Sequence, residues 1–254
     1  MIPRIVHLCW LSGDPYPELI QRCLMSWKEK LPGYQVKLWD RESFDVYTVP
    51  WVAEATARRK FAFAADYIRL HALYHYGGIY LDADVEVLRD LSDFLDTDSF
   101  IGFESSGDIE AAVIGAVPGK SWVGKCLEHY RDRHFVLPDG SLDQQPLPMI
   151  IGGILRSHYG LTGEVRGRTL LSEAGLTLLP FTYFSPKNLH TGKVALSRDT
   201  YCVHHFDGQW VERTWQHQLK RKLHALLSNT LGTEGYKRAV SAIRNIRSWK
   251  STRS

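Results

Sequence analysis

The stretch FAFAADYIRLHALYHYGGIYLDADVEVL, residues 61–88, decides how this chain folds. Its first part carries apolar residues at helical spacing, which predicts a helix with one buried face. Gly77 and Gly78 follow, and glycines are typical of helix ends because glycine adopts a positive φ without strain. The apolar run at residues 79–81 then predicts a buried central strand. A helix, a glycine stop and a strand are therefore expected in direct succession.

Two carboxylates, Asp82 and Asp84, follow this strand with one residue between them. Residues i and i+2 of an extended strand point to the same side, so both acids are expected to face one pocket. Acids that close repel each other unless positive charge lies between them. Hard divalent cations such as Mg²⁺ or Mn²⁺ take oxygen ligands and are commonly shared between carboxylates and substrate phosphates. An isolated Asp-x-Asp is usually a capped turn, but the elements before this one favour a cation site.

Asp66 and Arg69 lie three residues apart in the predicted helix, so their side chains are neighbours on its surface. Another apolar run at residues 5–10 predicts a first strand, which ends in the loop Leu11-Ser12-Gly13. The loop that leaves a first parallel strand is where open α/β sheets bind nucleotides. From its spacing alone, Trp10 is as well explained by a place in the core as by stacking on a nucleotide base.

The segments AADYIRL (64–70) and YGGIYLDADVEVL (76–88) resemble the sugar-binding region with the DXD motif that characterises glycosyltransferase family 32. That family includes bacterial capsule and lipopolysaccharide sugar transferases, the yeast initiating mannosyltransferase and, more distantly, the large clostridial glucosylating toxins. The segments at 2–13 and 32–40 are similar to the family's first two strands, and HHFDGQW (204–210) is similar to its closing motif. The resemblance spans about residues 2–212.

The resemblance implies an α/β fold of the GT-A type, in which helices flank a Rossmann-like mixed sheet. The change in charge near Trp215 places the boundary of the catalytic domain, so we expect the domain at residues 1–214 and a basic helical appendage at residues 215–254. Relatives commonly have a Thr-Gly-Pro-like turn where this chain has Ile-Ile-Gly-Gly at 150–153. Because of that departure, the resemblance does not identify the acceptor or the donor sugar of this chain.

The resemblance also implies roles for individual residues. Asp84 would be the direct ligand of Mn²⁺ or Mg²⁺, and Asp82 would bind ribose or sugar hydroxyls and contact the metal. Asp66 and Arg69 resemble the pair that holds the donor sugar, with Arg69 also a fixed cation near the diphosphate. Tyr80 would contact the phosphate or the sugar.

Aromatic and histidine residues at the two ends of the resemblance complete the expected site. The family places its base-stacking tryptophan in the segment that contains Trp10, and Trp210 belongs to the closing motif. The adjacent His204 and His205 are candidates for a further metal ligand, because neutral imidazole suits Mn²⁺ and its neighbours. The sequence favours His205 over His204.

The expected function is the metal-dependent transfer of a sugar, with retention of configuration, from a nucleotide-sugar donor. A UDP-sugar donor is favoured, with a glycan or lipid-linked acceptor in surface polysaccharide synthesis such as that of capsule or lipopolysaccharide. A non-catalytic sugar-nucleotide binder remains an alternative. An Asp-x-Asp phosphohydrolase is disfavoured because Val-Glu-Val, and not the required threonine, follows the acids at 85–87.

Composition sets further bounds. The chain has 254 residues, of which 44% are hydrophobic and 23% charged, as in an ordinary globular domain. We expect no signal peptide, no membrane span and reduced cysteines, and hence a cytoplasmic protein. Residues 215–254 hold nine Lys or Arg residues and one acid, Glu234, although the whole chain has a net charge of +3. Because this tail is also amphipathic, we expect it to bind an anionic membrane surface on the cytoplasmic face or to pack on the domain, and no nucleic acid is expected.

Overall fold

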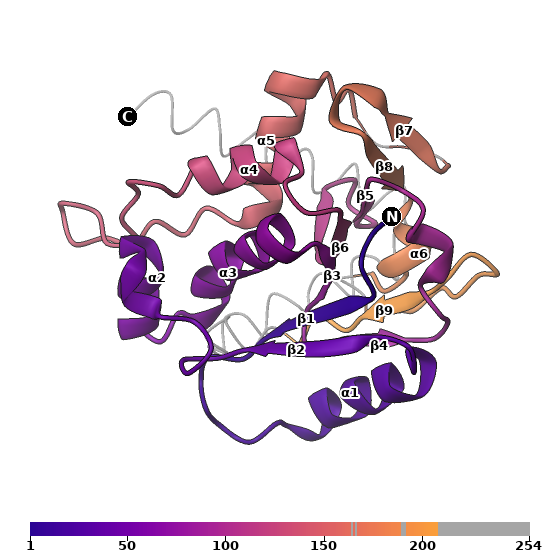
Figure 1. Cartoon of the computed structure of the whole chain (residues 1–254), viewed down its shortest axis with the longest axis horizontal. Helices are drawn as coiled ribbons and strands as arrows, with labels where there is room; N and C mark the ends of the chain where they lie inside the picture. Colours follow the sequence, from indigo (N-terminus) through magenta and orange to yellow (C-terminus); the bar gives the residue numbers. More distant parts are fainter. Residues whose placement is uncertain (164, 166, 189–191, 208–254) are drawn as a thin grey trace, which may run out of the picture. The chain divides into compact units, whose positions relative to one another are not determined.

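A mixed seven-stranded sheet organises the computed structural model, which describes residues 1–163, 165, 167–188 and 192–207 (Figure 1). The strand order is β2-β1-β3-β6-β5-β8-β7. Strand β1 is parallel to both β2 and β3, whereas β6 is antiparallel to its neighbours β3 and β5. Strand β8 is parallel to β5, and β7 is antiparallel to β8. The sheet thus has a parallel, Rossmann-like half that contains the N-terminal strands.

The strands of this sheet are β1 (Ile5–Cys9), β2 (Gln35–Trp39), β3 (Gly78–Leu81), β5 (Ser99–Phe103), β6 (Ile109–Ala116), β7 (Thr169–Leu171) and β8 (Leu176–Leu179). A second, two-stranded antiparallel sheet consists of β4 (Val85–Val87) and β9 (Cys202–His204).

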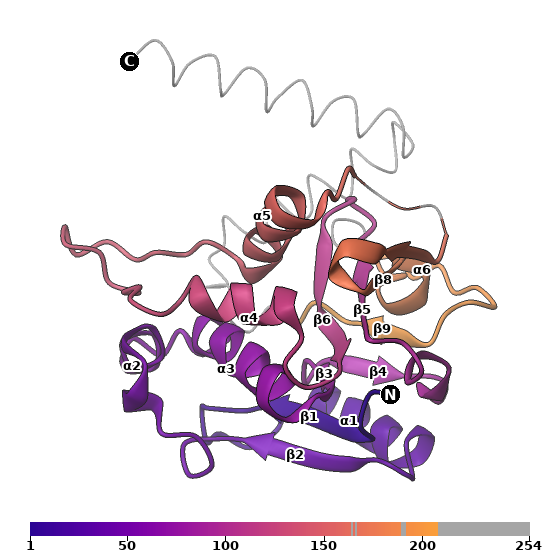
Figure 2. The same ribbon diagram turned by 45° about the horizontal axis from the view of Figure 1, so that its top comes forward.

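Helices cover both faces of the main sheet, as Figures 1 and 2 show. The α-helices are α1 (Glu18–Lys30), α2 (Pro50–Ala57), α3 (Phe61–Tyr76), α4 (Ser121–Glu128), α5 (Leu147–Tyr159) and α6 (Phe181–Phe184). Short 3-10 helices occur at η1 (Val46–Thr48), η2 (Ser92–Phe94) and η3 (Ser172–Ala174). On one face Tyr80 and Ile114 pack with residues of α2 to α5, and on the other Ile79 and Val113 pack with α1. The alternation of side chains along each strand supplies both cores.

The predicted succession of helix, glycine stop and strand is confirmed. Helix α3 ends at Tyr76, and Gly77 and Gly78 have φ values of 62° and 102°. The buried His7 of β1 holds this turn, because its Nε2 hydrogen-bonds to the Gly77 carbonyl at 2.7 Å and its Nδ1 to Trp39 Nε1 at 3.1 Å. Since Trp39 Nε1–H donates to Nδ1, the proton of the neutral ring lies on Nε2.

Strand β4 is attached to the helix on the other face. The indole Nε1 of Trp27 in α1 donates to the Val85 carbonyl at 2.7 Å, and Val87 N–H donates to the hydroxyl of Ser26 at 2.9 Å. These bonds fix the strand that follows the Asp-x-Asp motif, and β9 then pairs with it. The segment that follows β3 is therefore held by α1 and by β9.

The expected α/β class, a mixed sheet flanked by helices, is confirmed. The departure at residues 150–153 is not a turn in this chain, because these residues lie inside α5, whose apolar side chains pack in the core. All four cysteines are free, and three of them are buried. No helix among the described residues combines the length and the apolar character that a membrane crossing needs. The predicted boundary at 214/215 and the basic tail 215–254 lie outside the described residues.

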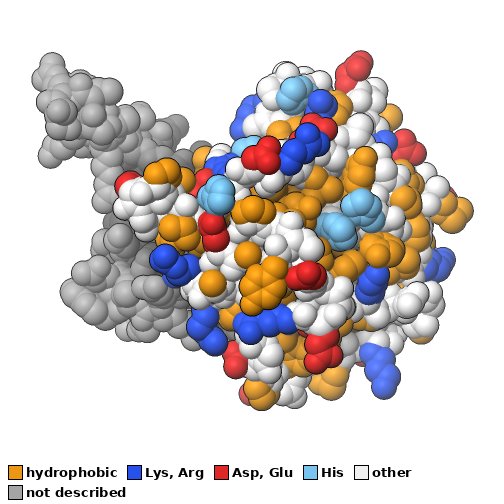
Figure 3. Space-filling view, turned by 60° about the vertical axis from the view of Figure 1, so that its left-hand side comes forward, with side chains coloured by type: hydrophobic (Ala, Val, Ile, Leu, Met, Phe, Trp, Pro, Cys, Tyr) orange, Lys and Arg blue, Asp and Glu red, His pale blue; other side chains and the backbone are white. Residues whose placement is uncertain are grey.

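The surface in Figure 3 has Lys, Arg, Asp and Glu side chains interspersed among exposed hydrophobic ones. The large exposed hydrophobic side chains include Tyr47, which is 84% exposed, and Met149, which is 61% exposed. Opposite charges are mixed on the described part of this face. The excess of basic residues seen in the sequence is concentrated in the tail.

Gly78→Ala should destabilise the protein far more than Gly119→Ala. Both glycines have a positive φ (102° and 71°), but a Cβ at Gly78 would lie 2.6 Å from the Ile5 carbonyl oxygen, whereas one at Gly119 would meet nothing within 4 Å. We expect a loss of about 1–2 kcal/mol in the free energy of unfolding for Gly119→Ala and at least twice that for Gly78→Ala. Urea denaturation measures both, and equal losses would contradict this account of the stop.

Neutral His7 should make the fold sensitive to acid. Burial lowers its pKa from 6.5 to about 4, against the opposing hydrogen bond to Gly77. The unfolded chain therefore binds the proton more readily between those pH values, and the free energy of unfolding falls as the pH drops from 6.5 to 4, by about 3 kcal/mol at most. Urea denaturation of wild type and His7→Gln across this range isolates the contribution. The two proteins should differ in slope, and parallel pH profiles would show that His7 is not its source.

Candidate metal and sugar-nucleotide site

A tight turn brings the two motif acids together. Strand β3 ends at Leu81, and Val85 N–H donates to the Asp82 carbonyl at 3.0 Å, which closes a turn over residues 82–85. The sequence argument placed both acids along an extended strand, and that detail is wrong. The carboxylates converge because the chain reverses at Ala83 to enter β4, and Asp82 N–H is tied to the Ala112 carbonyl at 2.9 Å.

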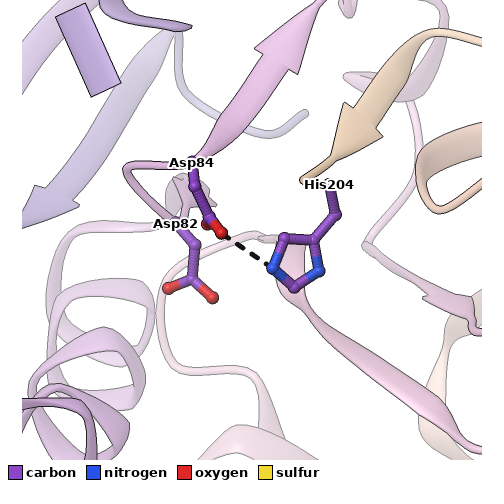
Figure 4. A group of neighbouring side chains, drawn as sticks. All are labelled: Asp82, Asp84 and His204. Carbon is purple, nitrogen blue, oxygen red and sulfur yellow. Dashed lines mark ion pairs between the residues drawn. The ribbon is translucent and has the colours of Figure 1, made fainter. Parts of the chain in front are cut away.

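His204, at the end of β9, completes a cluster with these acids. One ligand atom from each of Asp82, Asp84 and His204 lies within 4.8 Å of the other two. Figure 4 shows the three side chains gathered at the turn. The His204 Nε2 is 3.4 Å from Asp84 Oδ1. Segment 205–207 also closes on the turn, since Asp207 N–H donates to Asp84 Oδ2 at 2.8 Å and His205 N–H to the Asp84 carbonyl at 3.0 Å.

The structure favours His204 over His205 as a ligand, which reverses the order of preference from the sequence. Neighbouring residues of a strand point to opposite sides. His204, paired with Val85 in the β4–β9 ladder, faces the acids, whereas His205 Nε2 is bonded to Glu86 Oε2 at 2.8 Å. The ladder register, which the sequence does not reveal, makes this choice.

Arg69 lies between Asp66 and Asp82. One guanidinium nitrogen, Nη2, is 3.3 Å from Asp66 Oδ1 and 3.1 Å from Asp82 Oδ1, and the other, Nη1, donates to the Ala111 carbonyl at 2.7 Å. The guanidinium also lies 4.5 Å from the centre of the Tyr80 ring, whose hydroxyl donates to Asp82 Oδ1 at 3.0 Å. Four of the six residues that the sequence assigned to the donor site, namely Asp66, Arg69, Tyr80 and Asp82, are thus brought together.

Burial and neighbouring charges separate the proton affinities of the three acids. Burial raises the pKa of Asp66 to about 7 although Arg69 opposes the change, and it raises the pKa of Asp82 against the same cation. Burial would also raise the pKa of Asp84, but His204 and the Asp207 N–H outweigh it and hold that pKa at about 2. Asp84 is therefore the acid most firmly ionised and best suited to hold a cation.

The residues fit a divalent cation. Carboxylates suit Mg²⁺ and Mn²⁺, and an added imidazole favours Mn²⁺ and its neighbours over Mg²⁺. Asp82, Asp84 and His204 would hold the ion. Their place beyond the carboxyl end of β3 is also where open α/β sheets bind ligands.

Of the two tryptophans that the sequence assigned to the site, the structure describes only Trp10. Trp10 is partly exposed just after β1, its Nε1 donates to the Asp14 carbonyl at 2.8 Å, and its ring meets Tyr16 edge-on with centroids 4.9 Å apart. Its predicted role in base stacking stays a prediction. Trp210 lies outside the described residues.

Sequence reasoning missed Glu110. This acid is 1% exposed in β6 and contacts His204, with its Oε2 3.2 Å from the ring Nδ1. A signal was available, because a lone acid in an otherwise apolar strand is costly unless it is paired.

Arg69→Met should strongly destabilise the fold, because it leaves the buried Asp66 and the half-buried Asp82 without the cation that contacts both. We expect a loss of about 3–5 kcal/mol in the free energy of unfolding. Lys120→Met is the matched control, since Lys120 pairs at 2.9 Å with Asp98, whose side chain is 66% exposed, and should cost about 1 kcal/mol or less. Urea denaturation at pH 7 compares them. Similar losses for both variants would show that Arg69 does not stabilise the buried acids.

Comparisons with known proteins show which proteins this chain resembles. Residues 17–101 match the family model described as "Glycosyltransferase sugar-binding region containing DXD motif". Two mannosyl phosphorylinositol ceramide synthases of Saccharomyces cerevisiae are 26% and 28% identical over 76% and 73% of this chain. The matches cover 54% and 50% of those proteins, so this chain spans about half the length of the curated relatives it matches. A solved structure titled PaToxG glycosyltransferase is 19% identical, with a TM-score of 0.46 over 61% of this chain and 68% of that one.

Proposed function

Because residues 17–101 belong to the family of glycosyltransferase sugar-binding regions that contain the DXD motif, we propose that this protein is a metal-dependent glycosyltransferase of the GT-A type. It transfers a sugar from a nucleotide-sugar donor to a glycan or lipid-linked acceptor. The observation that carries the proposal is the convergence of Asp82, Asp84 and His204 beside the Arg69 guanidinium. Carboxylates and imidazole can hold a divalent cation, and the arginine adds a fixed positive charge.

The chain's own residues would orient the donor. Arg69 is held by the Ala111 carbonyl and by two acids, so its charge is fixed before a diphosphate arrives and need not be reorganised. The Tyr80 hydroxyl and Arg69 both contact Asp82 and so fix this carboxylate toward hydroxyls of the donor. A bound divalent cation would supply positive charge that stabilises the departing nucleoside diphosphate. Transfer with retention of configuration stays a prediction from the family resemblance.

The relatives suggest a sugar and an acceptor. Their names describe the mannosylation of inositol phosphoceramide, a lipid with an anionic headgroup. We therefore propose mannose and an inositol-phosphate lipid as the first sugar and acceptor to test. The UDP-linked donor and the role in capsule or lipopolysaccharide synthesis remain predictions, and so do the cytoplasmic location and membrane contact through residues 215–254.

Asp84→Asn should abolish metal-dependent turnover. A panel of UDP- and GDP-linked sugars, with Mn²⁺ and with or without inositol-phosphate lipid acceptors, measures nucleotide release. The wild type should turn over a donor only when the metal is present, and Asp84→Asn should lower the rate by at least about 100-fold, because a ligand beside the developing charge is lost. Asp98→Asn, an exposed acid paired with Lys120, is the control and should match the wild type.

Two outcomes would contradict the proposal. Undiminished turnover in a chelator would remove the metal from the reaction. Donor binding without release of nucleotide on any acceptor would favour the alternative of a non-catalytic sugar-nucleotide binder.

A further inference from the structure

Glu110 is a buried acid whose two carboxylate oxygens both have partners. It is 1% exposed, and its Oε1 accepts the Ala112 N–H at 2.7 Å. Its Oε2 accepts a hydrogen bond from the hydroxyl of Ser185 and lies 3.2 Å from His204 Nδ1. A carboxylate this deeply buried persists only when such bonds replace its hydration, so its orientation is fixed.

An irregularity in β6 makes this orientation available. The register of β6 on β5 shifts between Ile101, which pairs with Ile114, and Gly102, which pairs with Glu110. Residues 111–113 therefore have no register partner on β5, and the Ala112 N–H turns to the Glu110 side chain instead. Irregularities of this kind commonly re-aim side chains beside active sites.

The ring of His204 is held between two acids. Its Nδ1 lies beside Glu110 Oε2, and its Nε2 lies 3.4 Å from Asp84 Oδ1 on the side where Asp82 and Asp84 converge. An imidazole binds a metal through one nitrogen, and the hydrogen bond at the other nitrogen decides which one.

We propose that Glu110 is a positioning residue for His204, which it holds with Nε2 directed at the Asp82–Asp84 pocket by accepting the proton of Nδ1. Ser185 and the Ala112 N–H hold Glu110 in turn. This inference rests on the proposed metal-dependent function and adds to it a residue that does not itself contact the cation. A carboxylate behind a metal-binding histidine typically changes the metal affinity by 10–100-fold.

Binding of Mn²⁺ alone to the full chain tests the inference, with the signal of free Mn²⁺ in electron paramagnetic resonance as the readout. Asp84→Asn and His204→Ala should each weaken binding and thereby establish the site. Glu110→Ala should weaken it about 10–100-fold. Glu110→Gln keeps an oxygen that can accept from Nδ1 and should recover most of that loss. Because Glu110→Ala also removes three hydrogen-bonding contacts of a buried side chain, Ser185→Ala supplies a second variant, in which binding should weaken less than in Glu110→Ala.

Glu104→Gln is the matched control for a neighbouring acid that does not bond to the imidazole. Glu104 interacts electrostatically with both Glu110 and His204, but among the described contacts its carboxylate is bonded to Ser106 and not to the imidazole. It should leave Mn²⁺ affinity within a few-fold of the wild type. If Glu104→Gln weakens binding as much as Glu110→Ala, the loss does not depend on the bond to the imidazole and the positioning role is overturned.

A spectroscopic readout addresses the ring itself. In the Zn²⁺-loaded protein, long-range ¹H–¹⁵N spectra of labelled histidine, assigned with His204→Gln, should show a protonated Nδ1 and a metal-bound Nε2. A metal-bound Nδ1 would overturn the inference. So would normal Mn²⁺ affinity in Glu110→Ala alongside weak binding in His204→Ala, a result that leaves the proposed function intact. Wild-type affinity in Asp84→Asn would instead contradict the proposed function.

Discussion

A buried guanidinium and a partly buried imidazole lie between four acids that converge at one end of strand β3. Arg69 lies between Asp66 and Asp82, and His204 lies between Asp84 and Glu110. Acids this close repel one another and burial removes their hydration, so these two partners stabilise the arrangement at the turn after β3. The rest of the fold keeps these two side chains in place. Helix α3 supplies one from the face that packs on the sheet, and β9 supplies the other from a separate two-stranded ladder.

The position of β6 connects the two halves of this arrangement. Where β6 departs from regular pairing with β5, its backbone serves the site directly, since the Ala111 carbonyl accepts from Arg69 and the Ala112 N–H donates to Glu110. The Ala112 carbonyl also accepts from Asp82 N–H. One irregular stretch of strand thus holds the arginine, the motif turn and the acid behind the histidine. In a regularly paired strand, the backbone groups that here bond to Arg69 and Glu110 would pair with a neighbouring strand.

The sequence predicts well how site residues close together in the chain are arranged, and it predicts poorly which residues join the site from distant segments. Helical spacing places Asp66 beside Arg69, and the two glycines mark the stop of α3, because both features depend on residues close together in the chain. The choice between His204 and His205 depends instead on the register of β9 against β4, which is set by packing more than 100 residues away from the motif. Glu110 was missed for the same reason, since its partners come from distant elements. The sequence also did not predict the turn at Ala83. An extended strand and a turn both bring Asp82 and Asp84 to one side, so the Asp-x-Asp pattern does not distinguish them.

The two parts of the site are supported by different elements of the fold. Asp66, Arg69, Tyr80 and Asp82 come from one continuous stretch, whereas His204 arrives on a ladder of two three-residue strands, an element that is marginal by itself. The bonds from His205 N–H and Asp207 N–H to Asp84 therefore contribute to holding β9. Any ligand that contacts both Asp84 and His204 binds only the closed arrangement and stabilises it by mass action. Occupancy of the site and the local stability of β9 are thus coupled, because the same carboxylate takes part in both.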